Sequence, residues 1–287
     1  MSENSLSRHG ADALKKFETT SNSSEFTKDN IWFDWGNKEE HVIRIVGDFR
    51  ISRSHWIGES KFGNDVALLN SEAFKGDKKL PMTVACGNWD AESETEDPDG
   101  NACPVCRLGK NADLMLKKYG KELVETEKEK FKAIRRKCQA KSQYLFKIID
   151  RDNPYVDEEK TRKGYKILRA PEKLLKAILA LSDSMEGIAI TSPDEGIDIK
   201  IKKTVSDKTK TDVTYSALAV MAGAKVKQTP LTDEEKEYRD LDLLKFVGKP
   251  VDKERFEEML SDKNSVRTIY ENADIDAGDD EGGNAPF

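Results

Sequence analysis

Histidine, cysteine and long apolar runs are all scarce in this chain of 287 residues. Its four Cys are too few and too widely spaced for the disulfide framework of a small secreted domain. It has no run of 18 apolar residues, so no segment is expected to cross a membrane. Residues 1–17 lack the apolar stretch of a secretory signal. We therefore expect a cytoplasmic protein with reduced thiols.

Apolar residues are also limited, at 37% of the chain against 36% charged residues. This balance predicts a modest core and disordered ends. Residues 1–29 are rich in Ser, Asn and Thr and predict a flexible N-terminal arm. Residues 272–287 predict a disordered acidic tail. Between them we expect a core at 30–222 and a helical C-terminal region at 223–271.

Short strand-like runs separated by turns indicate the fold class. They favour a chain that is mainly β with helical insertions, as an OB-like, partly open barrel. They do not fit a series of βαβ units. Strands are predicted at 31–35, 41–51, 66–69, 80–85, 138–150, 164–169, 198–205 and 214–220, and helices at 111–136, 172–181, 232–246 and 252–260.

The four cysteines form the clearest motif. Cys103-Pro-Val-Cys106 is a C-x-x-C turn, which places two thiolates on one metal at tetrahedral angles. Cys86 ends one predicted strand and Cys138 begins another, so strand ends that meet can supply two further ligands. Cys86, Cys103, Cys106 and Cys138 therefore predict one structural zinc and a zinc subdomain, with no open position for catalysis.

Alternatives to this ligand set remain open. A lone C-x-x-C also serves as a redox dithiol, but that motif belongs inside a βαβ unit, and here an acidic loop precedes Cys103. His55 is an alternative ligand in place of Cys86 or Cys138, because His commonly binds zinc. Cys138 is otherwise a candidate for an ordinary small core residue.

The net charge of -6 hides a basic stretch. Between Lys130 and Arg169 thirteen Lys or Arg stand against five Asp or Glu. Single-stranded DNA is bound by cations that track its phosphates and by flat rings on which its bases stack. The predicted nucleic-acid-binding residues, which interleave cations with rings, are Lys132, Arg135, Arg136, Lys137, Lys141, Tyr144, Phe146, Arg151, Tyr155, Tyr165 and Lys166.

The rings of this stretch have a simpler alternative role. Tyr144 and Phe146 share one face of a strand, because side chains alternate along it, and ordinary core packing is as good an account of each. Further candidates for base stacking are Trp32, Phe33, Trp35 and Trp56.

The acidic tail is a second candidate for interaction. From Glu271 to the end the chain has six acids and no base, so the segment resembles phosphate in charge and is predicted to compete for the basic surface. Its Pro-Phe ending predicts a docking peptide for replication or recombination proteins; a plain solubilising tail is the alternative. The predicted docking residues are Asp279, Asp280, Glu281, Pro286 and Phe287.

The motifs CPVC, RRKCQAKSQYLFKIIDRDNP, GYKILRAPEKLLKAILAL and GIDIKIKKT resemble the single-stranded-DNA-binding (helix-destabilising) proteins of tailed bacteriophages, over roughly residues 30–205. The resemblance implies an OB-fold core, one structural zinc, and cooperative coating of single strands in replication, recombination and repair in the host cytoplasm. The best-known members bind zinc with one His and three Cys. No His lies a dozen residues before Cys86, so Cys138 is expected in that place. Arg8, Lys15 and Lys16 weakly echo the family's N-terminal cooperativity motif, which implies self-association along DNA.

Two rival functions are alternatives to this interpretation. A nuclease or recombination enzyme needs paired acids on ordered strands to hold Mg²⁺, and the candidates Asp150 and Asp152 fall in a predicted turn. No Walker loop or Ser/Cys–His constellation accompanies them. A zinc-knuckle adaptor for replication or transcription, acting through its tail, is the other alternative. We predict a sequence-independent single-strand binder that coats and protects DNA and is not an enzyme.

Overall fold

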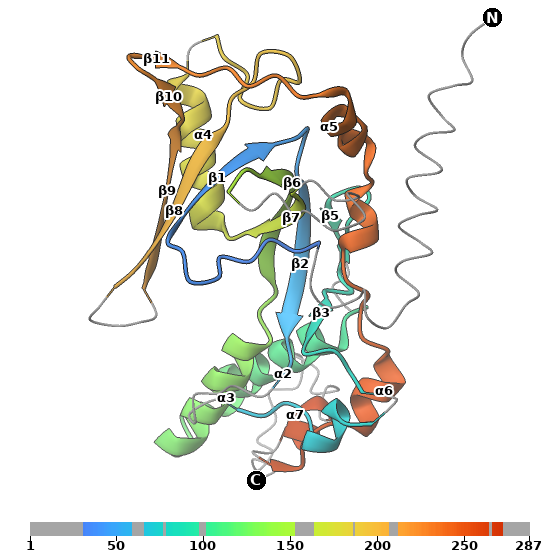
Figure 1. Ribbon diagram of the computed structural model, residues 1–287. Coiled ribbons are helices and arrows are strands. Elements are labelled where there is room, and N and C mark those ends of the chain that lie inside the picture. The colour runs from blue at the N-terminus through green and yellow to red at the C-terminus, as the bar shows by residue number, and fades with distance from the viewer. Residues whose placement is uncertain are drawn as a thin grey trace, which may run out of the picture. The chain divides into compact units, whose positions relative to one another are not determined.

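The structure is a computed structural model that describes residues 31–58, 66–76, 79–97, 102–152, 164–185, 187–206, 212–263 and 266–271 (Figure 1). The chain divides into two compact units, each built from two stretches of sequence. Unit 1 takes the residues up to Ile51 and Gln143–Lys245, and unit 2 takes Ser52–Ser142 and the residues from Phe246 onward. The predicted N-terminal arm and acidic tail lie outside the described residues.

Unit 1 is built on an antiparallel sheet. Its strands are β1 (Glu40–Ile45), β6 (Lys141–Asp150), β7 (Tyr165–Ala170), β8 (Ile199–Val205) and β9 (Val213–Ala219). They lie in the order β7-β6-β1-β8-β9. Within the described residues no pairing joins β7 to β9, so the sheet is open. The prediction of a mainly β chain with helices is confirmed, whereas a barrel is not seen.

One face of this sheet forms the core of unit 1. Ile43 pairs with Ile199, and Ile45 pairs with Ile148, so these side chains share a face. Helix α4 (Glu172–Ser184) begins directly after Pro171, as the sequence predicts. Its buried residues recur at helical spacing and join the same core: Leu174, Leu175, Ile178 and Leu181. Burying each Leu or Ile contributes about 1.5–3 kcal/mol.

The segment around α5 (Asp233–Glu237) packs on the β6–β7 part of unit 1. Tyr238, which begins the 3-10 helix η2 (Tyr238–Asp240), stacks on Tyr165 with ring centroids 4.6 Å apart, and its hydroxyl donates to the carbonyl of Lys166 at 2.8 Å. The predicted helix 232–246 is broken into short pieces, because the backbone is extended at Leu241, directly after η2. A further 3-10 helix, η3 (Leu243–Phe246), follows η2 along the chain. A small hairpin pairs β10 (Met221–Ala222) with β11 (Lys225–Val226).

Charged side chains buried in unit 1 are paired. Arg44 is fully buried and donates to the carbonyls of Ile190, Ser192 and Ile197, the last at 2.9 Å. A second buried cation, Lys147, donates to the carbonyl of Leu241 at 3.2 Å. Such pairing is what makes a buried charge tolerable.

Unit 2 combines short strands with helices. Strand β2 (Arg50–Trp56) pairs with β3 (Thr83–Ala85), and β4 (Trp89–Asp90) pairs with β5 (Thr95–Glu96). The predicted helix 111–136 is two helices, because the chain turns at Gly120–Val124. These are α2 (Pro104–Tyr119), with Pro104 in its first turn, and α3 (Glu125–Lys137).

Three further helices complete unit 2. They are η1 (Ser71–Phe74), α6 (Lys253–Glu258) and α7 (Val266–Glu271). The side chain of Asn111 in α2 donates to the carbonyls of Ile269 and Tyr270, at 3.1 and 3.2 Å, and so ties α2 to α7. The predicted strand 66–69 is reduced to a single bridge between Leu69 and Leu260. Among the described helices of the whole chain, none combines the length and apolarity that a membrane span requires.

Candidate metal centre and nucleic-acid surface

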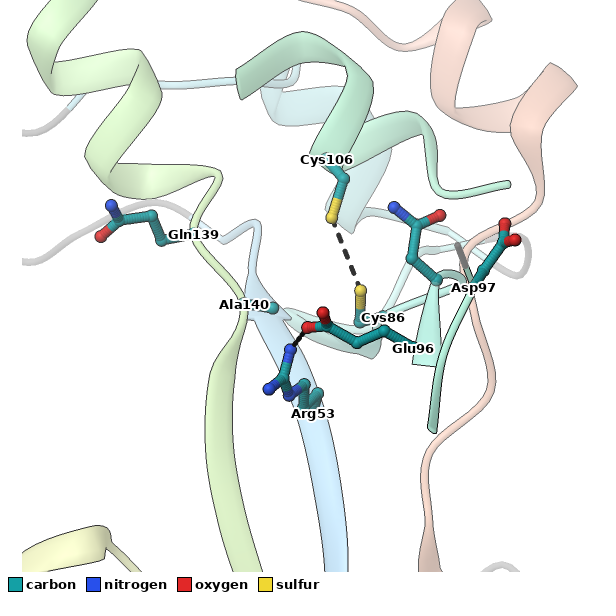
Figure 2. A pocket seen from close by; sticks show the side chains of 8 residues that line it. Arg53, Cys86, Glu96, Asp97, Cys106, Gln139 and Ala140 are labelled. Atoms are coloured by element: carbon teal, nitrogen blue, oxygen red, sulfur yellow. Dashed lines mark hydrogen bonds and ion pairs between the residues drawn. The ribbon is translucent and has the colours of Figure 1, made fainter. Parts of the chain in front are cut away.

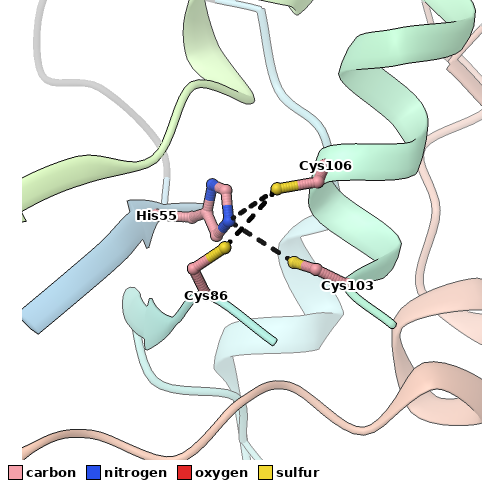
Figure 3. Close-up of side chains that lie close together, drawn as sticks. All are labelled: His55, Cys86, Cys103 and Cys106. Carbon is pink, nitrogen blue, oxygen red and sulfur yellow. Dashed lines mark hydrogen bonds between the residues drawn. The ribbon is translucent and has the colours of Figure 1, made fainter. Parts of the chain in front are cut away.

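A His/Cys cluster lies where the ends of β2 and β3 meet the start of α2 (Figure 3). His55 is near the end of β2, and Cys86 directly follows β3. The backbone N–H of Cys86 donates to the carbonyl of Arg53 at 2.8 Å, which fixes Cys86 beside β2. Cys103 is the N-cap residue of α2, and Cys106 lies in its first turn. Two strand ends and one helix start thus bring four soft donors together.

The spacing of these donors suits a tetrahedral metal ion. His55 Nε2 lies 3.4 Å from Cys103 Sγ and 3.5 Å from Cys106 Sγ, and the Sγ atoms of Cys86 and Cys106 are 3.5 Å apart. All four donors lie within 4.8 Å of one another. Tetrahedral zinc, with Zn–S near 2.3 Å and Zn–N near 2.0 Å, places its donors roughly 3.5–3.8 Å apart. The group can therefore hold a metal ion.

The electrostatics of the cluster also favour a cation. Burial lowers the pKa of His55, but its hydrogen bonds to Cys103 and Cys86 and their negative charge outweigh burial and raise the pKa to about 9. Hydrogen bonds with Cys106 and Cys86 lower the pKa of Cys103. The same contacts raise the pKa of Cys106, because a second thiolate beside the first is repelled. A divalent ion bound here would displace the proton of His55, remove this repulsion and allow all three thiolates to form.

The cluster corrects one predicted ligand. Cys138 is not among the four donors. It caps α3 and is buried, with its N–H donating to the carbonyl of Ile134 at 2.9 Å. A Cβ added to Gly109 would lie only 2.7 Å from Cys138 Cβ, so Cys138 fills the close contact between α2 and α3. Burial raises the pKa of its thiol. Cys138 is thus the small core residue of the alternative interpretation, and His55 is the fourth donor.

Asn88 supports the cluster and was missed by sequence reasoning. Its side-chain Oδ1 accepts a hydrogen bond from the backbone N–H of Cys103 at 2.7 Å, across fifteen positions of sequence. Its own carbonyl accepts from Asp97 N at 2.8 Å. A Cβ on Gly87 would come within 3.3 Å of the Cys103 backbone, so glycine permits this approach. The only sequence signal was the Gly-Asn turn pair after Cys86.

A shallow pocket opens beside the cluster (Figure 2). Arg53 makes an ion pair with Glu96 there, and its guanidinium lies 4.7 Å from the ring centroid of Trp89. Cys106 is half-buried and contributes to the wall. The lining residues are Arg53, Cys86, Asn88, Glu96, Asp97, Cys106, Gln139 and Ala140.

In unit 2, some of the predicted nucleic-acid-binding cations form ion pairs within the protein, and others are exposed. Lys132 makes an ion pair with Glu129 at 2.8 Å, and Arg135 pairs with Asp113 at 2.8 Å. Such pairs reduce the charge available to phosphate. Arg136 and Lys141 are exposed, whereas Lys137 is half-buried.

In unit 1, several predicted rings and cations are engaged within the protein. Phe146 is 3% exposed and belongs to the core, so the prediction that it stacks on bases is wrong. Tyr144 is half-buried, with its ring 5.8 Å from that of Phe49. Tyr165 is stacked on Tyr238.

Of the other nucleic-acid-binding residues predicted in unit 1, Arg151 and Lys166 also make contacts within the protein. Arg151 pairs with Asp198 at 3.3 Å and with Glu235. Lys166 is half-buried, and its carbonyl accepts the hydroxyl of Tyr238. Tyr155 lies outside the described residues, as do the tail residues Asp279, Asp280, Glu281, Pro286 and Phe287.

An exposed cation lies over an aromatic ring at the outer edge of β7. The guanidinium of Arg169 is 3.5 Å from the ring centroid of Trp32. Trp32 is held there because Phe33 N donates to the carbonyl of Ile167 at 2.9 Å, so residues 31–33 run beside β7. A looser pair joins Lys203 to Trp35 at 6.0 Å.

The paired acids of the rival nuclease hypothesis are held by backbone contacts. Asp152 Oδ2 accepts from Val42 N, and Asp150 Oδ1 accepts from Asp152 N, each at 3.0 Å. Comparison of the sequence with models of known protein families and with curated proteins finds no match.

Proposed function

We propose that this protein binds single-stranded DNA without sequence preference, through the sheet of unit 1, and that one structural zinc stabilises unit 2. The observation that carries the proposal is Arg169 stacked on Trp32 at the edge of an open sheet. The guanidinium offers a charge to a phosphate, and the indole offers a flat face to a base. These are the two contacts from which non-specific single-strand sites are built.

The order of the strands supports an OB-like interpretation of unit 1. β1 pairs with both β6 and β8, while β7 pairs with β6 and β9 pairs with β8. That is the pairing of a five-stranded Greek-key sheet left open between its third and fifth strands. OB folds bind oligonucleotides on the face of their second and third strands, which here are β6 and β7. Arg169 and Trp32 lie on the β7 side of this pair.

The proposed zinc has a structural role. His55, Cys86, Cys103 and Cys106 supply four protein ligands, which fill a tetrahedral ion and leave no position for a substrate. When bound, zinc would neutralise the thiolates and hold the ends of β2 and β3 against the start of α2. Coating of single strands, and the docking of replication or recombination proteins on the acidic tail, remain part of the proposal.

The proposal is tested by titrating labelled oligo(dT) and a duplex of equal length at several salt concentrations. We expect a preference for the single strand and a log–log salt slope of about -0.7 for each phosphate contacted. Arg169→Ala should weaken binding and flatten the slope by one contact. Lys176→Ala is the matched control, because Lys176 is exposed on α4 and pairs with Glu172. Equal affinity for duplex, or no binding, would reject the proposal.

A further inference from the structure

Two large apolar side chains lie exposed side by side in unit 2. Trp56 is 45% exposed and Met82 is 50% exposed. Trp56 ends β2 and pairs with Thr83, while the carbonyl of Met82 accepts from Ile57 N at 2.9 Å and from Gly58 N at 3.2 Å. A Cβ on Gly58 would lie 2.9 Å from Met82 Cβ and 3.2 Å from the Trp56 ring, so glycine permits this close packing.

Each of the other three tryptophans contacts a cation or an aromatic ring. Trp32 lies under Arg169, Trp89 lies under Arg53, and Trp35 contacts the ring of Phe33 at 5.5 Å. Within the described residues, no cation or aromatic ring contacts the indole of Trp56. Burial of a tryptophan is strongly favourable, so an indole left open at a strand end calls for a ligand.

We propose that Trp56, backed by Met82, is a stacking platform for one nucleobase of a bound single strand. The inference rests on the proposed function and adds a binding residue in unit 2. One aromatic side chain buries about 150–250 Å², whereas a stable protein partner needs about 800 Å² on each side. The patch is therefore the size of a base and too small for a protein interface. A thioether packs favourably against aromatic rings, which suits Met82 to the role.

The platform is separable from the metal centre. Side chains alternate along a strand, so Trp56 lies on the opposite face of β2 from the neighbouring ligand His55. A substitution at Trp56 therefore removes exposed surface without removing a metal donor. Zinc content and melting temperature are expected to stay at the wild-type values, which makes a change in DNA affinity interpretable.

The experiment compares wild type with Trp56→Ala, Trp56→Leu and Trp56→Phe on oligo(dT) and on an abasic oligonucleotide of equal length. We expect Trp56→Ala to weaken oligo(dT) binding between about fivefold and about 150-fold, the range that stacking of one base supplies. The salt slope should not change, because no phosphate contact is lost. Trp56→Phe should keep most of the affinity, whereas Trp56→Leu should behave like Trp56→Ala.

The abasic oligonucleotide separates stacking from a general structural effect. Wild type and Trp56→Ala should bind it equally, since it has no base to stack. If wild type binds oligo(dT) and Trp56→Ala binds within twofold of it, the platform is rejected while the proposed function stands. An equal loss on both oligonucleotides also rejects the platform. If wild type fails to bind oligo(dT), both proposals fall.

Discussion

The two units differ in how they satisfy their buried polar groups. In unit 1 every buried cation described above donates to oxygens of the same unit, as Arg44 does to the carbonyls of Ile190 and Ile197. In unit 2 the cluster of His55, Cys86, Cys103 and Cys106 brings three thiols and an imidazole within 4.8 Å of one another. Thiolates formed this close together repel one another. Unit 1 therefore satisfies these buried cations with its own oxygens, whereas the cluster of unit 2 could hold a metal ion.

The difference extends to the two cores. The core of unit 1 packs sheet residues such as Ile43 against helix α4, and needs no further component. The core of unit 2 runs through the cluster itself, because Cys86 and Cys103 are members of it along with Leu108 and Ile134. A metal ion that joins these cysteines would therefore stabilise packing far from its own ligands.

Removal of one metal ligand should produce the largest effect. His55→Ala and Cys103→Ser each leave three donors, and structural zinc sites contribute about 10–16 kcal/mol to the folding of small domains. We expect loss of the metal and unfolding of unit 2, while the strands of unit 1 remain protected. Elemental analysis and hydrogen exchange resolved along the chain would measure the two parts of this result.

Cys138→Ala is the control for that experiment. It removes a buried thiol that is not a donor in the cluster and keeps the Cβ that lies close to Gly109. The metal should stay at one ion per chain, with only a packing loss on the order of 1 kcal/mol. Loss of metal from Cys138→Ala and retention by His55→Ala would restore the ligand set that the sequence alone predicted.

The converse experiment targets unit 1. Arg44→Met removes the donor shared by the carbonyls of Ile190, Ser192 and Ile197. The carbonyl of Ser192 still accepts from Gly196 N at 3.0 Å, and that of Ile190 from Ile197 N at 3.4 Å. Loss of hydrogen bonds made by a charged group costs about 1.5–3 kcal/mol. We expect that loss in a denaturant titration of unit 1, with the metal of unit 2 retained. Lys200→Met, which removes an exposed partner of Glu40, should cost less than about 1 kcal/mol. Similar losses in the two variants would show that Arg44 does not anchor these carbonyls.

Asn88 tests whether the metal site depends on its supporting hydrogen bond. Asn88→Leu removes the acceptor for Cys103 N, whereas Asn88→Asp keeps one. Loss of a partner that orients a ligand typically costs about 10–100-fold in metal affinity. We expect Asn88→Leu to lose zinc faster to a chelator and Asn88→Asp to restore much of the retention. Unchanged zinc release in Asn88→Leu would show that the hydrogen bond does not position Cys103.

The sequence predicted what depends on local pattern. Alternation along β6 placed Tyr144 and Phe146 on one face, and the C-x-x-C motif identified Cys103 and Cys106. The start of α4 after Pro171 followed from local rules as well. These features depend on the neighbours of each residue in sequence.

The sequence could not predict what depends on tertiary packing. His55 lies 31 positions before Cys86, so the sequence offered it only as an alternative ligand and could not show that β2 carries it to the cluster. Whether Phe146 faces the core or the solvent depends on which side α4 covers. The stack of Tyr165 on Tyr238 joins residues 73 positions apart. Each of these outcomes follows from long-range contacts that short motifs do not encode.

The smallest predicted effect is a difference in the free energy of unfolding. It lies between removing the hydroxyl of Tyr238 and removing that of Tyr165, whose rings stack in unit 1. Tyr238 Oη donates to the carbonyl of Lys166, so Tyr238→Phe should cost about 1 kcal/mol. Tyr165 Oη is buried without a hydrogen-bond partner among the described residues, so Tyr165→Phe should be neutral or slightly stabilising. Denaturant titration at neutral pH measures the free energy of unfolding of both variants. Each variant keeps its aromatic ring, so the comparison isolates the hydroxyl groups.

The pH dependence of Tyr165 gives a second measurement of the same site. Burial, and next the charge of Glu235, raise the pKa of Tyr165 to about 12. The unfolded chain loses this proton near pH 10, while the folded protein keeps it. The free energy of unfolding should therefore fall as the pH rises from about 10 to about 12. Tyr165→Phe should remove its share of that fall. Tyr238→Phe should remove a share as well, because burial also raises the pKa of Tyr238. An identical alkaline loss in wild type and Tyr165→Phe would place the hydroxyl in water.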